Sequence, residues 1–257
     1  MPNMKNMGIH KETQILDLQT SWDKDSDRLI LYADIMGFKD RVMSTKHDEL
    51  KKSLLNFMES FNRKMKPLLK GDYLRYVQFS DSIIIVANGI DSKMFNIITK
   101  AGVCLMHGAM SHGFPIKGVF AKGMFTFDEE NDLYFGRPLV DAYLLHDELY
   151  YYGIVAHHSI ESLIKKYKIL DLPYCKNQIP LKKGKTSHYH LSWQFFKDNL
   201  SIGNISHKVE NWLTHIEETV SGSPRIYVDN TISVIKSDKY VKTKGSNAKD
   251  KPTVAIV

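Results

Sequence analysis

The sequence predicts an α+β protein in which helices lie on one face of a sheet. Two observations predict this class. Segments rich in β-branched and aromatic residues recur along the chain, and they alternate with segments whose apolar residues follow the helical period. In chain order these segments read strand, helix, strand, strand, helix, strand, and then a further helix. This order describes a βαββαβ core with additional elements.

The first strand is expected at Arg28–Ile35, an apolar run that leads directly into a helical segment. Asp34 lies at this junction, and Gly37 lies in the turn after it. The segment Phe38–Leu69 carries apolar residues at helical spacing, which predicts one or two amphipathic helices. Residues 1–26 are polar and show no clear period, so we expect them to form an N-terminal arm.

A hairpin and a second helix are expected next. Tyr73–Phe79 and Ser82–Ala87 are rich in β-branched and aromatic residues, and they are expected to pair around a turn at Ser80-Asp81. Asp91–His112 has the apolar spacing of a helix. Asp81 is therefore expected at the tip of a hairpin.

The last core elements are a long strand and a short strand that leads into a helix. Pro115–Phe127 reads as the long strand, in which Gly118 and Gly123 indicate the close approach of a backbone or a ligand. Leu133–His146 starts as a short strand and continues as a helix, with Pro138 suited to the first helical turn.

The C-terminal part is expected to extend the core as an α/β region at residues 158–236. A disordered tail rich in Lys, Ser and Gly is expected at 237–257. The elements expected around this region are a strand at Gly153–Ala156, a helix at Ser159–Tyr167, a basic loop at 168–187, a strand at His188–Trp193, and helices at Ile205–Val220 and Ser223–Lys236.

Size and composition predict a protein with a full hydrophobic core. The chain has 257 residues, of which 43% are hydrophobic. No apolar run is long enough for a transmembrane helix, and the N-terminus lacks the apolar core of a signal peptide. The only cysteines are Cys104 and Cys175, so a disulfide framework is not expected. These features predict a cytoplasmic protein without membrane contact.

The formal net charge of +6 raises the question of nucleic-acid binding. Much of the excess charge lies in lysine clusters at 165–168, 181–185 and 236–251. The sequence contains no zinc-finger spacing, no basic helix with heptads and no RNP-type aromatic motif. A solvated surface and a pocket for nucleotide phosphates explain the charge, and nucleic acid is not expected as a partner.

Asp34 and Asp81 occupy matching settings, each beside an apolar strand-like run. Each has a structural explanation when taken singly, Asp34 as a helix N-cap and Asp81 as a turn residue. A buried carboxylate needs a partner, however, and two carboxylates on neighbouring strands would form an oxygen site for Mg2+ or Mn2+. The backbone N–H groups of Met36, Gly37 and Phe38, at a helix start, would hold the phosphates that accompany the metal.

Three basic residues are candidates for substrate contacts, namely Lys117, Arg75 and Arg137. Lys117 starts the long strand, Arg75 would form a bidentate fork to a base or a phosphate, and Arg137 would contact the triphosphate. Each has an alternative that the residues leave open. These are a solvated strand end for Lys117, a surface cross-strand pair for Arg75, and an exposed helix start for Arg137.

Two groups of neighbouring histidines were also considered as metal sites, His157-His158 and His188-Tyr189-His190. Neither group has the cysteine or His-Glu spacing of known zinc motifs. Both groups are therefore predicted to lie on the surface.

Four pieces of the chain form a combined pattern: Tyr32–Phe38, which contains Asp-Ile-Met-Gly-Phe, then Gln78–Ser82, Lys117–Gly123, and Phe135-Gly136 ahead of Ala142. Together they resemble the catalytic domain of class III nucleotide cyclases, and the Asp-Ile-x-Gly-Phe piece is the most specific. The resemblance implies a ferredoxin-like βαββαβ catalytic core at 27–157, followed by the C-terminal helical extension.

The resemblance also implies a site. In that family the aspartates of the first and second motifs bind two metal ions, Mg2+ or Mn2+, and these correspond here to Asp34 and Asp81. The backbone carbonyl of Ile35 would be a further ligand, and the substrate would be a nucleoside triphosphate. Class III cyclases build their sites between two catalytic domains, so a homodimer with sites at its interface is implied.

The chain departs from the purine cyclases at positions that matter in that family. Arg75 and Leu133 fall on the base-selecting positions, and Val140 and Leu144 replace an Asn and an Arg that stabilise the transition state. This pattern looks like the pyrimidine cyclases of bacterial Pycsar anti-phage defence. That likeness implies conversion of UTP or CTP to cyclic UMP or cyclic CMP plus pyrophosphate, as a second messenger read by a separate effector protein. The alternatives are a catalytically silent module that binds nucleotides and a purine cyclase.

Overall fold

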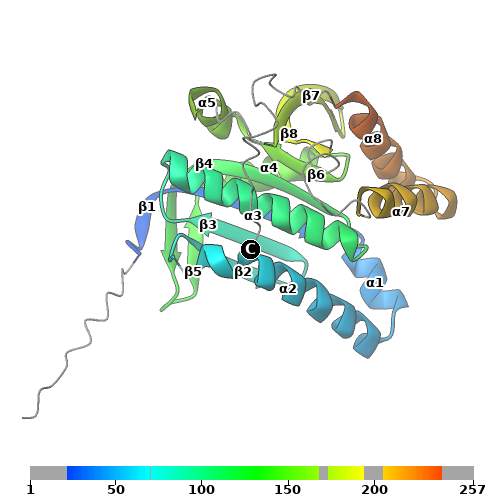
Figure 1. Cartoon of the computed structure of the whole chain (residues 1–257), viewed down its shortest axis with the longest axis horizontal. Coiled ribbons are helices and arrows are strands. Elements are labelled where there is room, and N and C mark those ends of the chain that lie inside the picture. Colours follow the sequence, from blue (N-terminus) through cyan, green and yellow to red (C-terminus); the bar gives the residue numbers. More distant parts are fainter. Residues whose placement is uncertain (1–21, 70, 168–172, 194–204, 239–257) are drawn as a thin grey trace, which may run out of the picture.

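The computed structural model describes residues 22–69, 71–167, 173–193 and 205–238. Within them, eight strands form one sheet in the order β2-β3-β1-β4-β6-β8-β7, with β5 paired to β4 (Figure 1). The strands are β1 (Asp25–Ile35), β2 (Leu74–Phe79), β3 (Ser82–Ala87), β4 (Ile116–Asp128), β5 (Leu133–Gly136), β6 (Gly153–Ala156), β7 (Tyr174–Leu181) and β8 (Gly184–Leu191). The helices are α1 (Phe38–Ser44), α2 (His47–Leu69), α3 (Ser92–Ser111), α4 (Arg137–Glu148), α5 (His158–Tyr167), α7 (Ile205–Thr219) and α8 (Ser223–Ser237).

The predicted βαββαβ core is confirmed. Its strands lie in the order β2-β3-β1-β4, and β1 pairs antiparallel with both β3 and β4. This strand order is that of a ferredoxin-like sheet. The central position of β1 explains its apolar run, because Leu29, Leu31 and Ala33 are fully buried.

Helices lie on both faces of the sheet. Gly102 of α3 approaches the side chains of Leu31 and Phe120, which places α3 on their face of the sheet. Gly123 of β4 approaches Pro138 of α4, and because residues 120 and 123 belong to opposite alternating sets, α4 lies on the other face. The sequence predicted helices on one face only, so α4 corrects that part of the prediction.

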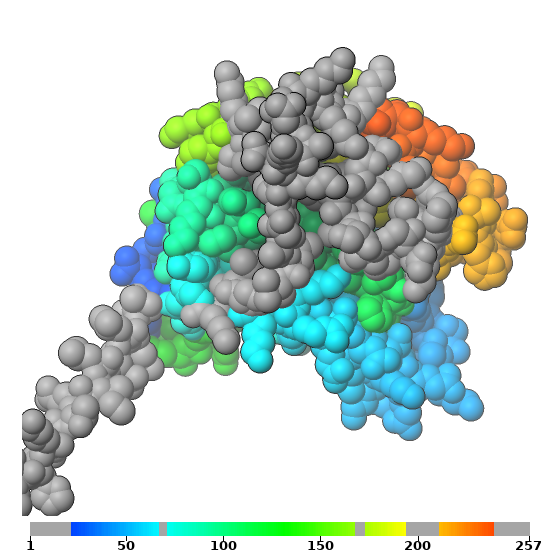
Figure 2. Space-filling model, viewed as in Figure 1, coloured from blue at the N-terminus to red at the C-terminus, as the bar shows by residue number. Residues whose placement is uncertain are grey.

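The two long core helices are amphipathic, as predicted. Phe57, Phe61 and Met65 recur every four residues of α2 and are fully buried. α3 begins after Asp91, whose side chain accepts the N–H of Met94 at 2.8 Å as an N-cap. Figure 2 shows the face of the molecule on which α2, in light blue, lies beside α3, in green.

The glycines of β4 mark close approaches, as predicted. A Cβ atom at Gly118 would lie 3.1 Å from the carbonyl oxygen of Tyr32, and one at Gly123 would lie 3.3 Å from Pro138. Both approaches are to neighbouring protein elements. They allow β1, β4 and α4 to pack closely beside one another.

The predicted N-terminal arm overlaps the folded core. β1 begins at Asp25, and Trp22 is 9% exposed with its ring 5.4 Å from that of Phe127. Residues 22–26 therefore belong to the folded core, and the predicted arm is wrong for them. The rest of the predicted arm, residues 1–21, lies outside the described residues.

The predicted basic loop at 168–187 is wrong from Tyr174 onward, because β7 and β8 form a hairpin there. Its strand signal is weak because most of the hairpin side chains are polar and Pro180 interrupts the pattern. The structure accommodates Pro180 because β7 is an edge strand, where the missing N–H is tolerated. Residues 168–172 lie outside the described residues.

The hairpin continues the same sheet through β8, since Val155 of β6 pairs with His190. The predicted helices of the C-terminal region are confirmed as α5, α7 and α8. α8 runs through Ser237, so the predicted tail is wrong for that residue, and residues 239–257 lie outside the described residues. None of the helices in the described ranges is long and apolar enough to cross a bilayer.

Candidate functional site

The end of β1 and the β2–β3 turn bring Asp34 and Asp81 to one edge of the sheet. Asp34 pairs with Ser82 of β3. Asp81 lies in the two-residue turn, and its carbonyl oxygen accepts the N–H of Ile35 at 3.0 Å. Ser80 has a φ of 55°, a conformation uncommon for a residue other than glycine, which lets two residues close the turn. The turn is thus tied directly to the strand that carries Asp34.

The electrostatics of Asp34 are those of a carboxylate in need of a cation. Its pKa is raised, first because burial disfavours the charged form and second because the Asp81 carboxylate lies nearby. A hydrogen bond from Ser82 Oγ to Asp34 Oδ1, 3.0 Å long, and the charge of Lys117 offset part of the rise in pKa. Two like charges at a partly buried edge are stabilised by a divalent ion with oxygen ligands. The residues present therefore fit Mg2+ or Mn2+.

Tyr32 belongs to this site, although the sequence reasoning did not select it. Its hydroxyl lies 3.3 Å from Ser82 Oγ, which donates in turn to Asp34. Burial raises the pKa of Tyr32, so its hydroxyl keeps its proton. The alternation of a strand could have predicted this, because Tyr32 and Asp34 are two residues apart and their side chains therefore lie on the same face of β1.

Lys117 lies directly opposite Asp34 in the β1–β4 pair, so both side chains leave the same face of the sheet. Its side chain is not a solvated strand end, because Lys117 is only 4% exposed. Nζ donates to the carbonyl oxygens of His146 and Leu149 at 3.2 Å, and it lies 3.4 Å from Tyr227 Oη. Burial lowers the pKa of Lys117 to about 8. Lys117 therefore joins the end of α4 to the strand beside Asp34.

His146 of α4 is a second residue that the sequence reasoning missed. Its ring stands nearly perpendicular to that of Tyr32, with centroids 5.1 Å apart. It is 6% exposed, and its Nε2 has no hydrogen-bond partner among the described residues. Burial and then the charge of Lys117 lower the pKa of His146 to about 3, so the ring is neutral near pH 7. Its position on the buried face of α4, four residues after Ala142, was the available signal.

In the loop after β1, one of the three backbone N–H groups predicted to bind phosphate is already hydrogen-bonded. The N–H of Met36 donates to the carbonyl oxygen of Pro115 at 2.7 Å, so this donor is engaged within the chain. Met36 is therefore a correction to the predicted set of phosphate-binding amides. Gly37 has a φ of +70° and precedes Phe38, the first residue of α1. The glycine is needed for this turn because other residues rarely adopt that conformation.

The structure does not bring Arg75 to the aspartates. Arg75 forms ion pairs with Asp72, at 3.0 Å, and with Glu129, and its guanidinium lies over the ring of Trp22. This arrangement corresponds to the surface-pair alternative. Arg75 pairs with Val86, which is four residues along β3 from Ser82.

Arg137 also lies away from the aspartates of its own chain. Its side chain is 85% exposed and pairs with Asp141 at 3.4 Å. The preceding residue, Gly136, pairs with Phe125, which is eight residues along β4 from Lys117. At the usual rise per residue this separation is roughly 26 Å.

The outer surface of α4 carries an apolar strip formed by Val140, Tyr143 and Leu144. These side chains are 57%, 54% and 58% exposed, respectively. Their spacing places them on one side of the helix. The ring of Tyr143 is 6.0 Å from that of Tyr32, so the strip borders the site.

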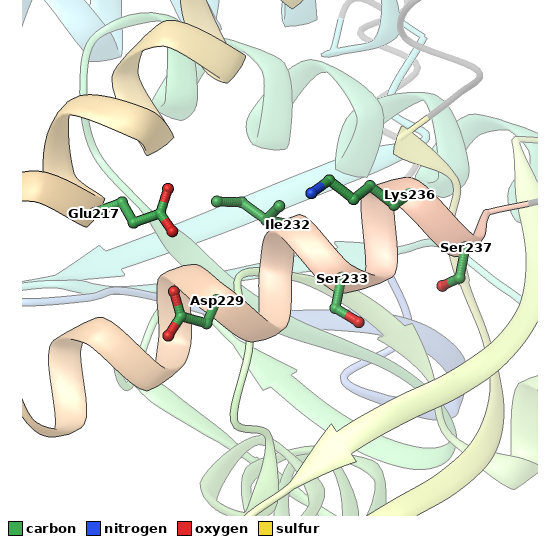
Figure 3. Close-up of a pocket in the computed structure, with 6 residues that line it drawn as sticks. All are labelled: Glu217, Asp229, Ile232, Ser233, Lys236 and Ser237. Atoms are coloured by element: carbon green, nitrogen blue, oxygen red, sulfur yellow. The ribbon is translucent and has the colours of Figure 1, made fainter.

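A shallow hollow between α7 and α8 is lined by Glu217, Asp229, Ile232, Ser233, Lys236 and Ser237 (Figure 3). Both of its carboxylates already pair with Arg225, at 3.1 Å for Glu217 and 3.0 Å for Asp229. Arg225 thus engages both carboxylates, and none of the predicted site residues lines the hollow, so it is not the candidate active site.

The prediction that the histidines lie on the surface is wrong for His190. This residue is 0% exposed and contacts Cys175 and Asp238. His158 is exposed, as predicted. Cys175 lies fifteen residues before His190 on β7, the strand that falls within the predicted basic loop.

Neither a protein-family model nor a curated protein sequence matches this chain. Solved structures do match it, among them the guanylyl cyclase domain of the RhoGC fusion protein from the aquatic fungus Blastocladiella emersonii. The dimeric structure of that domain has a TM-score of 0.50 and 13% identity, over 65% of this chain and 97% of that one. The monomeric structure has a TM-score of 0.51 and 14% identity, over 65% of this chain and 96% of that one.

This chain has the fold of a class III nucleotide cyclase catalytic domain. At this identity the likeness is one of fold. The predicted fold class is thereby confirmed.

Proposed function

We propose that the protein is a metal-dependent nucleotide cyclase that converts UTP or CTP to cyclic UMP or cyclic CMP and pyrophosphate. The observation that carries the proposal is the pair of Asp34 and Asp81 at the strand ends of a cyclase-like sheet. Burial and the neighbouring Asp81 carboxylate raise the pKa of Asp34, so a cation would stabilise its charged form. On the resemblance to the Pycsar cyclases, the product would be a second messenger in anti-phage defence, read by an effector protein.

The reaction is an intramolecular phosphoryl transfer, in which a ribose hydroxyl oxygen attacks the α-phosphorus and pyrophosphate leaves. Two ions of Mg2+ or Mn2+ would be held by Asp34, Asp81 and the carbonyl of Ile35, and they would supply the positive charge that activates the hydroxyl and neutralises the triphosphate. Asp34 is oriented for this role by Ser82, and Ser82 is held in turn by Tyr32.

The other residues of the site position the substrate. The N–H groups of Gly37 and Phe38 at the start of α1 would contact phosphate oxygens. Lys117, with a pKa of about 8, carries its charge near pH 7 and stands beside Asp34. Its bonds to the last carbonyls of α4 give it a second task, which is to hold that helix against the sheet.

A homodimer would complete the site. The apolar strip of α4, formed by Val140, Tyr143 and Leu144, lies next to Tyr32 and is more than half exposed in the single chain. A symmetric partner would bury this strip and bring its own exposed residues to the aspartates. Arg137, far from Asp34 within its own chain, would serve the triphosphate of the partner's site in this arrangement.

Two other functions have support from particular observations. A purine cyclase is favoured by the guanylyl cyclase domains that share the fold. A silent nucleotide-binding module is favoured by Val140 and Leu144, which place apolar side chains where the resembling enzymes carry polar ones. Because Arg75 is paired with Asp72 and Glu129, the pyrimidine assignment rests on the sequence resemblance alone. Arg75 would contact a base only after leaving these two partners.

The decisive experiment is incubation of the purified chain with each of the four ribonucleoside triphosphates and Mn2+, followed by mass spectrometry. We expect cyclic UMP or cyclic CMP, and we expect no product from Asp34→Ala or Asp81→Ala. The control is Glu59→Gln, which neutralises an exposed carboxylate on α2. Cyclic AMP or cyclic GMP would replace the pyrimidine assignment, and the absence of any product would favour the silent module.

The dimer has its own test. Leu144→Glu places a charge in the α4 strip without entering the buried core, and it does not introduce the arginine that the resembling cyclases carry. We expect light scattering to show a dimer for the wild type and a monomer for this variant, with turnover reduced in proportion. A wild-type monomer that retains full activity would contradict the dimeric site.

A further inference from the structure

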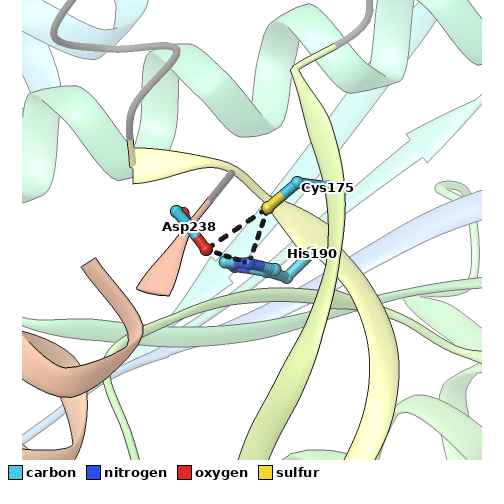
Figure 4. A group of neighbouring side chains, drawn as sticks. All are labelled: Cys175, His190 and Asp238. Carbon is cyan, nitrogen blue, oxygen red and sulfur yellow. Dashed lines mark hydrogen bonds and ion pairs between the residues drawn. The ribbon is translucent and has the colours of Figure 1, made fainter. Parts of the chain in front are cut away.

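Cys175, His190 and Asp238 form a second group of metal-ligating side chains, apart from the aspartates of the proposed active site (Figure 4). Cys175 on β7 and His190 on β8 are direct cross-strand partners. Asp238 follows the last residue of α8. Three elements of the C-terminal region therefore meet at this cluster.

The three ligand atoms converge on one point. Cys175 Sγ lies 3.0 Å from His190 Nε2 and 3.3 Å from Asp238 Oδ1, and the latter two atoms are 2.9 Å apart. Nε2–H and Sγ–H can each donate to Oδ1, but these two hydrogen bonds leave Sγ and Nε2 only 3.0 Å apart with no bond between them. The ring nitrogen has a single in-plane position, which holds either a proton or a lone pair, so Nε2 cannot serve both partners with aligned bonds. A shared cation would satisfy all three atoms at once.

Burial and charge point the same way. The side chains of His190 and Asp238 are 0% exposed, and Cys175 is 8% exposed. Among the described residues, the Asp238 carboxylate also accepts from two neutral donors, the side-chain amide of Asn177 at 2.8 Å and the N–H of Trp193 at 2.9 Å. A fully buried carboxylate requires a positive partner. Among these contacts only His190 can carry a positive charge.

We propose that Cys175 Sγ, His190 Nε2 and Asp238 Oδ1 bind a zinc ion. A thiolate, an imidazole and a carboxylate are the ligand types of Zn2+, whereas Mg2+ takes oxygen ligands. Around a tetrahedral zinc ion such atoms lie about 3.4–3.6 Å apart, so the triangle must widen by about 0.3–0.6 Å. The thiol proton of Cys175 is released to solvent when the ion binds. Asn177 or a water supplies the fourth ligand.

The ion would act as a structural clamp. It fastens the end of α8 to the β7–β8 hairpin at the edge of the sheet. Elsewhere α8 contacts the core, since Tyr227 lies 3.4 Å from Lys117 Nζ and Thr231 accepts the N–H of Tyr152 at 2.9 Å. The clamp therefore holds a helix that touches the lysine beside Asp34.

The metal content of the full chain tests the proposal directly. The protein is purified without chelator and dialysed, and its zinc is measured by mass spectrometry. We expect one equivalent of zinc per chain. After the zinc is removed, titration with Co2+ should give the near-ultraviolet thiolate-to-cobalt band and the visible bands of a tetrahedral ion. The thiolate band distinguishes this site from the oxygen ligands of Asp34 and Asp81.

Variants assign the ligands. Cys104 and Cys175 are the only cysteines, so a thiolate band that persists in Cys104→Ser must come from Cys175. Cys175→Ser should lose the band, and Asn177→Ala should weaken metal affinity by about 10–100-fold. The Cys104→Ser measurement decides even if Cys175→Ser does not fold. A wild-type chain that holds neither zinc nor a thiolate–cobalt band would overturn the proposal, as would a band lost in Cys104→Ser.

Discussion

The two clusters of this protein differ in chemistry and in access. The Asp34 and Asp81 pair offers oxygen atoms at a partly exposed sheet edge, beside a loop and a helix start. The Cys175, His190 and Asp238 cluster offers sulfur, nitrogen and oxygen atoms in a buried position. A hard cation such as Mg2+, which would bind together with the substrate, suits the oxygen atoms of the first cluster. A borderline cation such as Zn2+, bound permanently, suits the mixed ligands of the second.

This difference has an energetic counterpart. The raised pKa of Asp34 means that its charge weakens folding, and the site keeps this unfavourable charge ready for a cation. The pKa of Asp238 is lowered despite burial, because His190 and the neighbouring donors stabilise its charge. The proposed active site therefore keeps an unfavourable charge, whereas the second cluster stabilises its own.

The largest expected effect concerns turnover at the first cluster. Asp34→Ala or Asp81→Ala should reduce the cyclase rate by at least about 10²–10³-fold, the scale seen for the loss of one electrostatic group. The double variant should be little worse than either single one, because the two carboxylates act as a unit. Rates under saturating Mn2+ check this. Additive losses would show that the aspartates work separately.

The next effect concerns stability at the second cluster. His190→Ala should destabilise the chain by about 3–5 kcal/mol, because the buried Asp238 carboxylate would lose the ring nitrogen that pairs with it. Urea denaturation measures the change. His158→Ala, at an exposed histidine, is the control. His190→Ala combined with Asp238→Asn should recover part of the loss, and a double variant that is less stable still would contradict this account.

A third effect links the two clusters through Lys117, which α8 contacts. The pKa of Lys117 is about 8 in the folded chain and 10.5 ordinarily, so the unfolded chain binds this proton more tightly. Its contribution to stability therefore rises between pH 8 and 10.5 and is lost as the pH falls through this window, by up to about 3 kcal/mol. The difference between wild type and Lys117→Met, measured by urea denaturation across that range, should show this rise. A difference independent of pH would contradict it.

The smallest expected effect is on the stability of the chain when the charge of Asp34 is removed. Asp34→Asn should stabilise the metal-free chain, because Asp34 has a raised pKa and its charge opposes folding at every pH above that pKa. A gain of about 1 kcal/mol would raise Tm by about 2–4 °C in a chain of this size. Scanning calorimetry in chelator measures it, with Glu59→Gln as the control. A lower Tm for Asp34→Asn would mean that the aspartate is structural.

Much of the core and its aspartates could be predicted from the sequence. The strand of β1, the hairpin around Asp81 and the helix α3 each show their own period, and local propensity places them without knowledge of their neighbours. The strand positions of Asp34 and Asp81 followed from those elements. Tyr32 was within reach of the same reasoning, because it shares a strand face with Asp34.

The second cluster could not be predicted in this way. The hairpin of β7 and β8 is rich in polar residues and contains a proline, so its apolar period is weak. Its ligands come from positions 175, 190 and 238, and only the register of two strands and the packing of α8 bring them together. The partners of Arg75 and Lys117 likewise depend on which elements pack beside them.

The amino-acid sequence thus carried the order of the core elements and the two carboxylates at their ends, because periodicity and turn chemistry act over a few residues. The packing of the folded chain determined what surrounds those carboxylates, because it placed Lys117 and His146 in buried positions beside them. It also brought the residues of the Cys175 cluster together. These outcomes depend on burial and on contacts between residues far apart in the chain, which raise or lower a pKa by several units without leaving a local pattern.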